Sequence, residues 1–470
     1  MLKFRNALLL VASRRSTGGL RRYPQGHSPA RWFGASVATS QGGVPATREW
    51  LRMRHINRAA IVKIAAAAIA VAFGLSSIAS SSAKPAASST VDFYSSLPLS
   101  GSSTAQTLPL VNGIKLALSQ AGYKAGNYKI KYTSLNDATA AAGAWDPSQT
   151  GANARQVAED SKAVYYIGEF NSGASEVSAP ILNTAGIAQD SPANTYVGLT
   201  ASLAGVTAPG EPAKYMPSGK HTYTRIVPID TIQGAADLLA LKNTGCTKLA
   251  VFDDTQAYGA GLAAVLKAEA SMYGMTIVYL GSDPNVEANY TSVASAIAAS
   301  GAQCVELSAT TSSVGGTAFA TAVHSALPNA TLLGPDGMCS SAWTTSFQVL
   351  CTVATLDLKA YPGGRTFLAA YKKAYHVGNP DPYSIYGYAS AELGLHTLAG
   401  LKAGLSGKAL QAAFVKALFA TKDLKSVLGT YSITKTGDTT LTSYGLYTLD
   451  NGTLTFSKTL HPTKYLKATA

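Results

Sequence analysis

Two short polar turns in the first half of the chain carry the residue types best suited to holding an anion. An apolar run at 163–167 ends in a turn that contains Ser172 and Gly173, and a second run at 186–189 ends at Ser191. The helical pattern between the runs predicts a strand, helix, strand unit of a parallel sheet. Turns after parallel strands lie side by side, and a helix begins at the first of them, so we predict a cradle for a carboxylate. The alternative is that these residues only cap a helix and turn the chain.

Strands and helices alternate on both sides of these turns. Predicted strands are 91–94, 128–135, 163–167, 186–189, 223–228, 248–253, 276–280, 304–307 and 331–333, with strand-like runs at 429–433, 445–449 and 453–456. Predicted helices are 105–121, 149–160, 172–182, 231–242, 259–273, 290–300, 316–327, 386–403 and 407–420. A Pro- and Gly-rich loop at 199–221 separates two similar cycles. The pattern predicts an α/β protein with two successive parallel sheets.

Positive charge is concentrated at the amino terminus. The chain has 38 Lys and Arg against 25 Asp and Glu, a net charge of +13. Twelve of these basic residues lie at or before Lys63, where Glu49 is the single acid, so the rest of the chain carries only +2. A nucleic-acid-binding face on the body of the protein is therefore not expected.

An export signal is predicted inside this basic region. Positive residues at 53–58, an apolar run at 61–75 and small residues at 77–83 have the pattern of a secretory signal peptide, and the run is short for a membrane span. The 52 residues before Met53 form a basic extension, which we interpret as the product of a start codon placed too early; the alternative is a genuine long leader or an Arg-rich tail. No Cys lies near the cleavage region, so a lipoprotein anchor is not expected and the protein is predicted to be periplasmic or at the cell surface.

Four cysteines lie in the body of the chain, which suggests disulfides in an exported protein. They are Cys246, Cys304, Cys339 and Cys351. Cys246 and Cys304 each stand at the start of an apolar run, so they could be bridged if those strands are neighbours, which leaves Cys339 with Cys351. Three pairings are possible.

Six motifs in order resemble the type I periplasmic-binding-protein family, in its leucine/isoleucine/valine-binding branch of ABC-transporter substrate-binding proteins. They lie at 97–101 with 112–117, 165–175, 191–195, 254–259, 334–337 and 386–389. The resemblance covers about residues 90 to 460. It implies two Rossmann-like lobes that are joined by three hinge crossings, with a small ligand bound between them. Lobe 1 would comprise 91–228 and 358–430, and lobe 2 would comprise 229–357 and 431–460, followed by a tail at 461–470.

The resemblance also implies roles for particular residues. Ser172 and Gly173 would hold the α-carboxylate of an amino acid. The second turn would help to bind both the carboxylate and the ammonium of this ligand, through Ser191, Asn194 and Thr195. In lobe 2, Tyr258 would close over the ligand and Asp336 would pair with the ammonium. Such a zwitterion needs hydroxyl and N–H donors at one end and a carboxylate at the other.

Two positions depart from the family pattern. Gln106 and Thr310 stand where the family often has aromatic residues facing the ligand side chain. These polar residues indicate a ligand that is smaller, more polar or of another shape than leucine.

Two other functions are alternatives to a transport protein. The segment 259–264 fits the dinucleotide pattern Gly-x-Gly-x-x-Ala with Asp283 as the ribose acid, but five residues separate these glycines from the strand, whereas that fingerprint needs a direct turn. The seven His are scattered and no phosphate loop or nucleophile motif is present, so neither an enzyme, a cofactor nor a metal is predicted. A sensor of the same fold for amides or amino acids is the main alternative. The favoured prediction is a monomeric binding protein that delivers its ligand to the permease and ATPase subunits of an ABC transporter.

Overall fold

The computed structural model describes residues 89–284, 289–311 and 316–469, which all fall in one compact unit. The predicted basic extension at 1–52, the export signal at 53–83 and most of the linker at 84–90 lie outside the described residues. Among the described residues, no helix is both long and apolar enough to cross a membrane.

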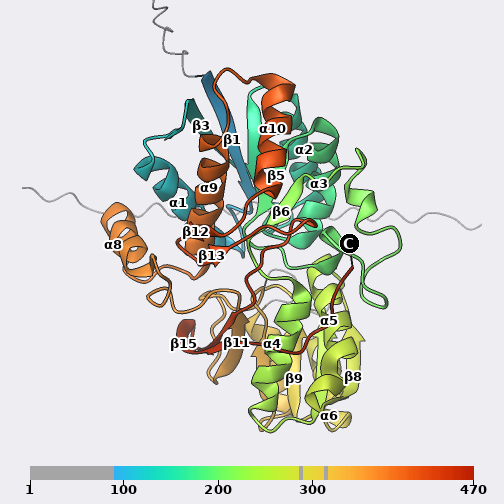
Figure 1. Ribbon diagram of the computed structural model, residues 1–470. Helices are drawn as coiled ribbons and strands as arrows, with labels where there is room; N and C mark the ends of the chain where they lie inside the picture. The colour runs from blue at the N-terminus through green and yellow to red at the C-terminus, as the bar shows by residue number, and fades with distance from the viewer. Residues whose placement is uncertain (1–88, 285–288, 312–315, 470) are drawn as a thin grey trace, which may run out of the picture. The chain divides into compact units, whose positions relative to one another are not determined.

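The first sheet forms the centre of what we call lobe 1 (Figure 1). Its strand order is β2-β3-β1-β4-β5-β6, and every pairing except that of β2 with β3 is parallel. Its strands are β1 (Ser89–Leu97), β2 (Lys124–Ala125), β3 (Tyr128–Asn136), β4 (Ala163–Ile167), β5 (Ala188–Ser191) and β6 (Tyr223–Arg225). The parallel order places the turns after β4 and β5 side by side, as the sequence predicts.

Successive aromatic residues of β4 pack on opposite faces of this sheet, because side chains alternate along a strand. The Tyr165 ring lies 5.3 Å from that of Phe414 in α10 (Gly407–Phe419), and its hydroxyl donates to the Ser390 carbonyl of α9 (Tyr383–Ala399) at 3.0 Å. Tyr166 packs in a separate cluster with Val157 of α2 (Pro147–Glu159) and Leu182 of α3 (Ser172–Ala185). Helices α9 and α10 thus cover one face, and α2 and α3 cover the other.

The second sheet forms the centre of what we call lobe 2. Its order is β15-β14-β11-β10-β9-β7-β8, from β7 (Lys248–Asp253), β8 (Thr276–Ser282), β9 (Cys304–Ser308), β10 (Thr331–Gly334), β11 (Val349–Val353), β14 (Tyr444–Asp450) and β15 (Thr453–Leu460). Helices α4 (Asp230–Lys242), α5 (Ala257–Glu269), α6 (Tyr290–Ala299) and α7 (Thr317–Ala326) accompany these strands. The sheet is mixed and mostly parallel, because β14 pairs antiparallel with both β11 and β15. The expectation of a wholly parallel second sheet is wrong at this edge.

The remaining elements connect or extend the two lobes. The chain passes between the sheets after β6, after β11 and after the small hairpin of β12 (Leu424–Ser426) and β13 (Gly429–Tyr431). Three short helices are η1 (Val197–Leu199) at the start of the predicted long loop, η2 (Ala213–Tyr215) within it, and η3 (Ala270–Tyr273). Helix α8 (Gly364–Tyr375) packs on α1 (Thr104–Gln120). Strand β11 was not predicted, because its five residues stand alone between irregular segments.

The two disulfides have the pairing that the positions of Cys246 and Cys304 in the sequence suggested, one of three possible pairings. Cys246 is bonded to Cys304, and Cys339 is bonded to Cys351. Cys304 opens β9, which pairs with β7 next to Cys246, so the first disulfide closes the amino edge of the sheet.

Helices α1 and α9 meet backbone to backbone in lobe 1. A Cβ atom on Gly387 of α9 would lie 2.0 Å from the Leu110 carbonyl oxygen, and one on Gly113 of α1 would lie 2.0 Å from the Ser384 carbonyl oxygen. Real Cβ atoms do not approach backbone so closely, so glycine at both positions allows the two helices to pack at this distance.

Replacing Gly387 by alanine is therefore expected to lower the free energy of unfolding by about 2–3 kcal/mol, because the helices must separate to admit the methyl group. Urea unfolding measures this loss. Gly400→Ala is the control: its Cβ would lie 3.7 Å from the nearest atom, and it should change stability by less than about 0.5 kcal/mol. Equal stability of the two variants would contradict the close packing of α1 and α9.

Candidate functional site

The first polar turn is fixed between β4 and α3 by internal hydrogen bonds. Helix α3 begins at Ser172, and the Glu169 amide donates to the Ser175 hydroxyl at 3.2 Å. The Asn194 side-chain amide donates to the Phe170 carbonyl at 2.8 Å. These contacts hold the start of α3 at the carboxyl edge of the sheet, where its free N–H groups can receive an anion.

Gly173 is packed closely against a neighbouring side chain at this turn. A Cβ at this position would lie 3.0 Å from the ring of Trp145. The indole of Trp145 thus packs over the first turn. The sequence predicts Trp145 in a loop and indicates no role for it, since only the tertiary fold brings that loop beside α3.

The second polar turn uses its side chains within lobe 1. The Ser191 hydroxyl donates to the Glu169 carbonyl at 2.8 Å and accepts the Asn194 amide at 2.8 Å. The Asn194 side-chain oxygen accepts the hydroxyls of Ser175 at 2.5 Å and Tyr223 at 3.0 Å. The structure thus gives Ser191 and Asn194 partners that join the two turns to each other, and Ala193 is the residue of this turn that lines the cavity described below.

Thr195 is buried at the end of the same turn. Its carbonyl accepts the amide of Asp230, the first residue of α4, at 2.9 Å. Thr195 therefore lies where the chain passes from lobe 1 to lobe 2, and outside the residues that line the cavity.

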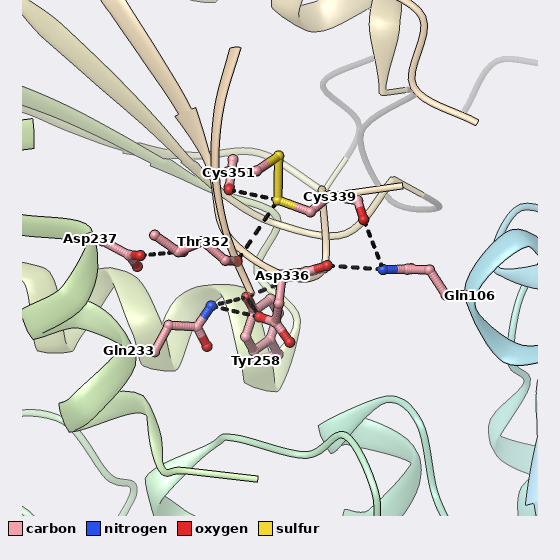
Figure 2. The surroundings of a disulfide bond; sticks show 10 residues. Gln106, Gln233, Asp237, Tyr258, Asp336, Cys339, Cys351 and Thr352 are labelled. Atoms are coloured by element: carbon pink, nitrogen blue, oxygen red, sulfur yellow. Dashed lines mark hydrogen bonds between the residues drawn. A yellow bond between two sulfur atoms is a disulfide. The ribbon is translucent and has the colours of Figure 1, made fainter. Parts of the chain in front are cut away.

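Asp336 is the centre of the polar contacts in lobe 2 (Figure 2). Its carboxylate accepts hydrogen bonds from the hydroxyls of Tyr258 and Tyr383 and, at 2.6 Å, from the side-chain amide of Gln233. The residue is only 3% exposed. Burial raises the pKa of Asp336 above its ordinary value, although these donors oppose the rise.

Tyr383 and Gln233 are site residues that the sequence analysis missed. Tyr383 opens α9, which packs on lobe 1, so its contact with Asp336 joins the two lobes. The helix was predicted to begin at Tyr386, whose hydroxyl instead donates to the Ala354 carbonyl at 2.8 Å. A tyrosine at the first turn of a helix near a hinge is the signal that could have identified Tyr383.

Gln106 lies in the first turn of α1 but bonds to the backbone of lobe 2. Its side-chain amide donates to the Asp336 carbonyl at 3.0 Å and to the Cys339 carbonyl at 3.3 Å. Gln106 does not line the cavity, whereas Thr310 does. In this conformation Gln106 is therefore a contact between the lobes.

The two turns and the Asp336 cluster enclose a small cavity between the lobes. Its volume is about 20 Å³, which is about the space of one water molecule. The lining residues are Phe170, Asn171, Ser172, Ala193, Tyr258, Thr310, Asp336, Gly337 and Tyr383. An amino acid or an aromatic acid is larger than this volume, so lining side chains such as Tyr258 and Tyr383 must rotate to admit it.

A buried pair of acids lies behind the first turn. The carboxylate of Asp137 meets no hydrogen-bond donor among the described residues, and Tyr166 donates its hydroxyl to Glu169. Burial raises the pKa of Asp137 to about 7, and burial together with the negative Asp137 raises the pKa of Glu169 well above its ordinary value. The native protein therefore holds protons here that the unfolded chain releases.

Asp137→Asn should consequently flatten the pH dependence of stability. Since the native pKa of Asp137 is raised from 3.8 to about 7, wild-type stability falls as pH rises through this interval. Urea unfolding at pH 5 and pH 8 should show little change in the variant at pH 5 and a gain on the order of 2 kcal/mol at pH 8. Asp450→Asn at an exposed strand end is the control. A variant that loses stability equally at both pH values would contradict a protonated pair.

The dinucleotide alternative does not fit the geometry of α5. Gly259 and Gly261 lie inside this helix, after its start at Ala257. A Cβ on Gly259 would lie 2.2 Å from the Asp254 carboxylate, and one on Gly261 would lie 2.4 Å from the Tyr196 ring. These glycines serve packing and do not form a phosphate-binding turn.

Two α/β lobes with polar turns at the carboxyl ends of their strands, and with a cavity between them, define a two-lobe ligand-binding protein. The sequence profile of the family described as "Periplasmic binding protein" matches residues 95–453. The chain therefore belongs to the periplasmic binding protein family. This is a family of binding proteins, which confirms that the chain is not an enzyme.

Individual relatives agree with this family. The curated Leu/Ile/Val-binding protein homolog 3 of Brucella melitensis is 26% identical over 219 residues, which cover 45% of this chain and 56% of that protein. The chain thus aligns with little more than half of the length of this relative.

Solved structures show the same fold. The leucine-binding protein of Thermotoga maritima matches with a TM-score of 0.65 and 18% identity, over 79% of this chain and 99% of that one. A solute-binding protein of R. palustris in complex with benzoate matches with a TM-score of 0.66 and 17% identity, over 81% and 99% of the two chains. A branched-chain amino acid binding protein of Streptococcus pneumoniae in complex with isoleucine has a TM-score of 0.63 and 16% identity, over 79% and 100%.

Proposed function

We propose that this chain is the extracytoplasmic solute-binding protein of an ABC importer, which captures a small amino-acid-like ligand and delivers it to the membrane permease. The observation that carries the proposal is the cavity between the lobes, where the start of α3 faces the buried Asp336. The names of the Brucella, Thermotoga and Streptococcus proteins support this ligand class. The predicted export signal supports delivery to a transporter and not a role in the cytoplasm.

In this proposal the two ends of a zwitterion bind to different lobes. Ser172 and Gly173 receive the carboxylate at the N-terminus of α3, where N–H groups and the helix dipole favour an anion. Asp336 pairs with the ammonium, and the hydroxyls of Tyr258 and Tyr383 rotate to make room for it. Because both charged ends are satisfied only when the lobes are together, the ligand shifts the hinge equilibrium toward the closed state.

A small aromatic carboxylate is a second candidate ligand, favoured by two observations. Asp336 already has three donors from the protein and does not require an ammonium. The cavity is also rich in aromatic rings, with those of Phe170 and Tyr383 packed edge to face at 5.1 Å. The benzoate complex of the R. palustris protein is consistent with this ligand class.

A thermal-shift screen of residues 84–470 separates these candidates. The probes are the standard amino acids, small amides, urea, benzoate and 4-hydroxybenzoate. A ligand at about 100 times its Kd should stabilise the protein by about 2.7 kcal/mol, which is a clear rise in Tm. If amino acids have no effect and an aromatic acid does, the second candidate replaces the first; if no probe raises Tm, both ligand classes fail.

Ser172→Ala should weaken binding of either ligand class without changing the fold. Removal of one hydroxyl donor to a carboxylate is expected to raise Kd about five- to thirtyfold. Isothermal titration calorimetry with the best probe of the screen measures the change. Thr184→Ala, near the other end of α3, is the control and should leave Kd unaltered. An unaltered Kd for Ser172→Ala would remove Ser172 from the site.

A further inference from the structure

The loop at 335–343, between β10 and β11, carries both the Asp336 carboxylate and one half of a disulfide. Cys339 is bonded to Cys351 of β11, with their Cα atoms 5.7 Å apart (Figure 2). In the sheet, Cys351 pairs with Gly334, the last residue of β10. The disulfide therefore ties the loop back onto the strand beside the one from which it leaves.

The same short stretch of backbone makes the contact with Gln106 of lobe 1. The two acceptors of the Gln106 amide are the carbonyls of Asp336 and Cys339, and Gln106 is only 2% exposed. One of these carbonyls belongs to a disulfide-bonded residue, and the other lies three residues before it. The direction of both carbonyls thus depends on where the disulfide holds Cys339.

The rest of the loop is packed tightly into lobe 2. The Gly337 carbonyl accepts the amide of Thr311 at 3.1 Å, and a Cβ on Gly337 would lie 2.7 Å from the Ala309 carbonyl oxygen. A Cβ on Gly334 would lie 2.5 Å from the buried ring of Trp343. With so little room, a displacement of Cys339 would reach Asp336 and the surface that meets Gln106.

The Cys246–Cys304 disulfide offers a matched comparison within the same lobe. It joins the amino ends of β7 and β9, at the edge of the sheet opposite to the cavity. Its neighbours Thr247 and Gln303 bond to each other and not to any cavity residue. The Cys246–Cys304 disulfide joins cysteines 58 residues apart, against 12 for Cys339 and Cys351, and it does not contact the cavity residues.

We propose that the Cys339–Cys351 disulfide is a positioning element of the ligand site. It holds the carbonyls of Asp336 and Cys339 where Gln106 of the facing lobe binds them, and in this way it sets how readily the lobes close. This inference rests on the proposed function, in which closure of the lobes captures the ligand. The disulfide at Cys246 and Cys304 stabilises the fold alone.

The first test compares two double variants, Cys339→Ala with Cys351→Ala, and Cys246→Ala with Cys304→Ala. Both should lower Tm, because each removes a disulfide. Calorimetric titration with leucine, isoleucine or benzoate, whichever gives the largest thermal shift in the screen, should show Kd raised about tenfold in the first variant and within about twofold of wild type in the second. Equal Kd changes in the two variants would overturn the proposal.

If the first variant does not fold, the disulfide is opened in the folded protein instead. In the Cys246→Ala, Cys304→Ala background the single remaining disulfide is Cys339–Cys351, so reduction with dithiothreitol followed by alkylation opens that bond alone. The same rise in Kd is expected. An unchanged Kd after complete alkylation would overturn the proposal.

A double-mutant cycle tests whether the disulfide acts through Gln106. Gln106→Glu keeps the shape of the side chain but removes the amide donors, and it should raise Kd about three- to tenfold. Combined with the open Cys339–Cys351 pair, it should add less than about twofold, because the contact is already lost. Additive effects would show that the disulfide does not position this contact.

The cycle is also measured on the unfolding equilibrium in urea, without ligand. The same pair should be non-additive there, while Gln106→Glu and the Cys246, Cys304 double variant should be additive. If no probe binds the wild type, the proposed ligand classes fail, but the unfolding cycle still decides whether the disulfide and Gln106 are coupled. Additivity in that cycle overturns the proposal on its own.

Discussion

Asp336→Ala is expected to abolish amino-acid binding, with a rise in Kd of more than about 100-fold, because the ammonium would lose its buried counter-charge. The variant should also lose about 2–4 kcal/mol of stability, since the side chains of Gln233, Tyr258 and Tyr383 would lose the acceptor they share. Titration calorimetry and urea unfolding measure the two losses separately. The protein should remain folded at 25 °C.

Asp336→Asn removes the negative charge at this position and keeps the size of the side chain. It keeps an acceptor oxygen for the donors, so stability should fall less than in the alanine variant. Leucine should still bind at least tenfold more weakly than to wild type, whereas benzoate should change by less than about threefold, because it brings no positive charge. Unchanged leucine affinity in both variants would show that Asp336 does not pair with an ammonium.

Arg225→Ala is expected to cause the largest loss of stability of any single substitution considered, about 3–5 kcal/mol in urea unfolding. The guanidinium is fully buried and forms an ion pair with Asp438 at 2.8 Å. It also donates to the carbonyls of Asn194 at 3.1 Å and Tyr196 at 2.7 Å. Its removal would take this donor away from both carbonyls behind the second polar turn, so ligand affinity should fall as well.

Lys214→Ala is the matched control for this ion pair. Lys214 pairs with Glu211 at the same distance, 2.8 Å, but its side chain is 45% exposed. The Glu211 side chain is only 1% exposed, but it keeps three other donors, the hydroxyls of Tyr196 and Tyr215 and the Ala208 amide. The expected change is therefore less than about 1 kcal/mol. If Arg225→Ala were as mild as this control, the buried ion pair would not be what holds the second turn.

Much of the fold follows from local patterns in the sequence. The alternation of apolar runs with helical segments was sufficient to predict strand 163–167 at its observed bounds and the two sheets in their chain order. Strand β11 was missed and the antiparallel edge was not foreseen, because both depend on which strands become neighbours. Pairing between strands about 90 residues apart, such as β11 with β14, leaves no local signal.

The residues of the candidate site could also be predicted only in part. Tyr258, Thr310 and Asp336 could be named because the resemblance to the family assigns ligand positions to them, and all three line the cavity. Tyr383 could not, because its contact with Asp336 spans 47 residues and depends on how a late helix lies against lobe 1. The interpretation of Gln106 as a ligand contact took account of its position on α1 but not of the lobe 2 loop that accepts its hydrogen bonds.

The close contact of α1 with α9 also bears on the order in which the protein can fold. Lobe 1 begins at β1, yet its first helix packs its glycine against a helix that starts at Tyr383. A chain that has emerged only as far as lobe 2 therefore lacks α9 and α10, and one face of the first sheet is covered only in part, by α1. Such non-local contacts slow folding. Under the proposed export of this chain, slow folding would keep it unfolded during secretion, since lobe 1 could not be completed until nearly the whole chain had crossed the membrane.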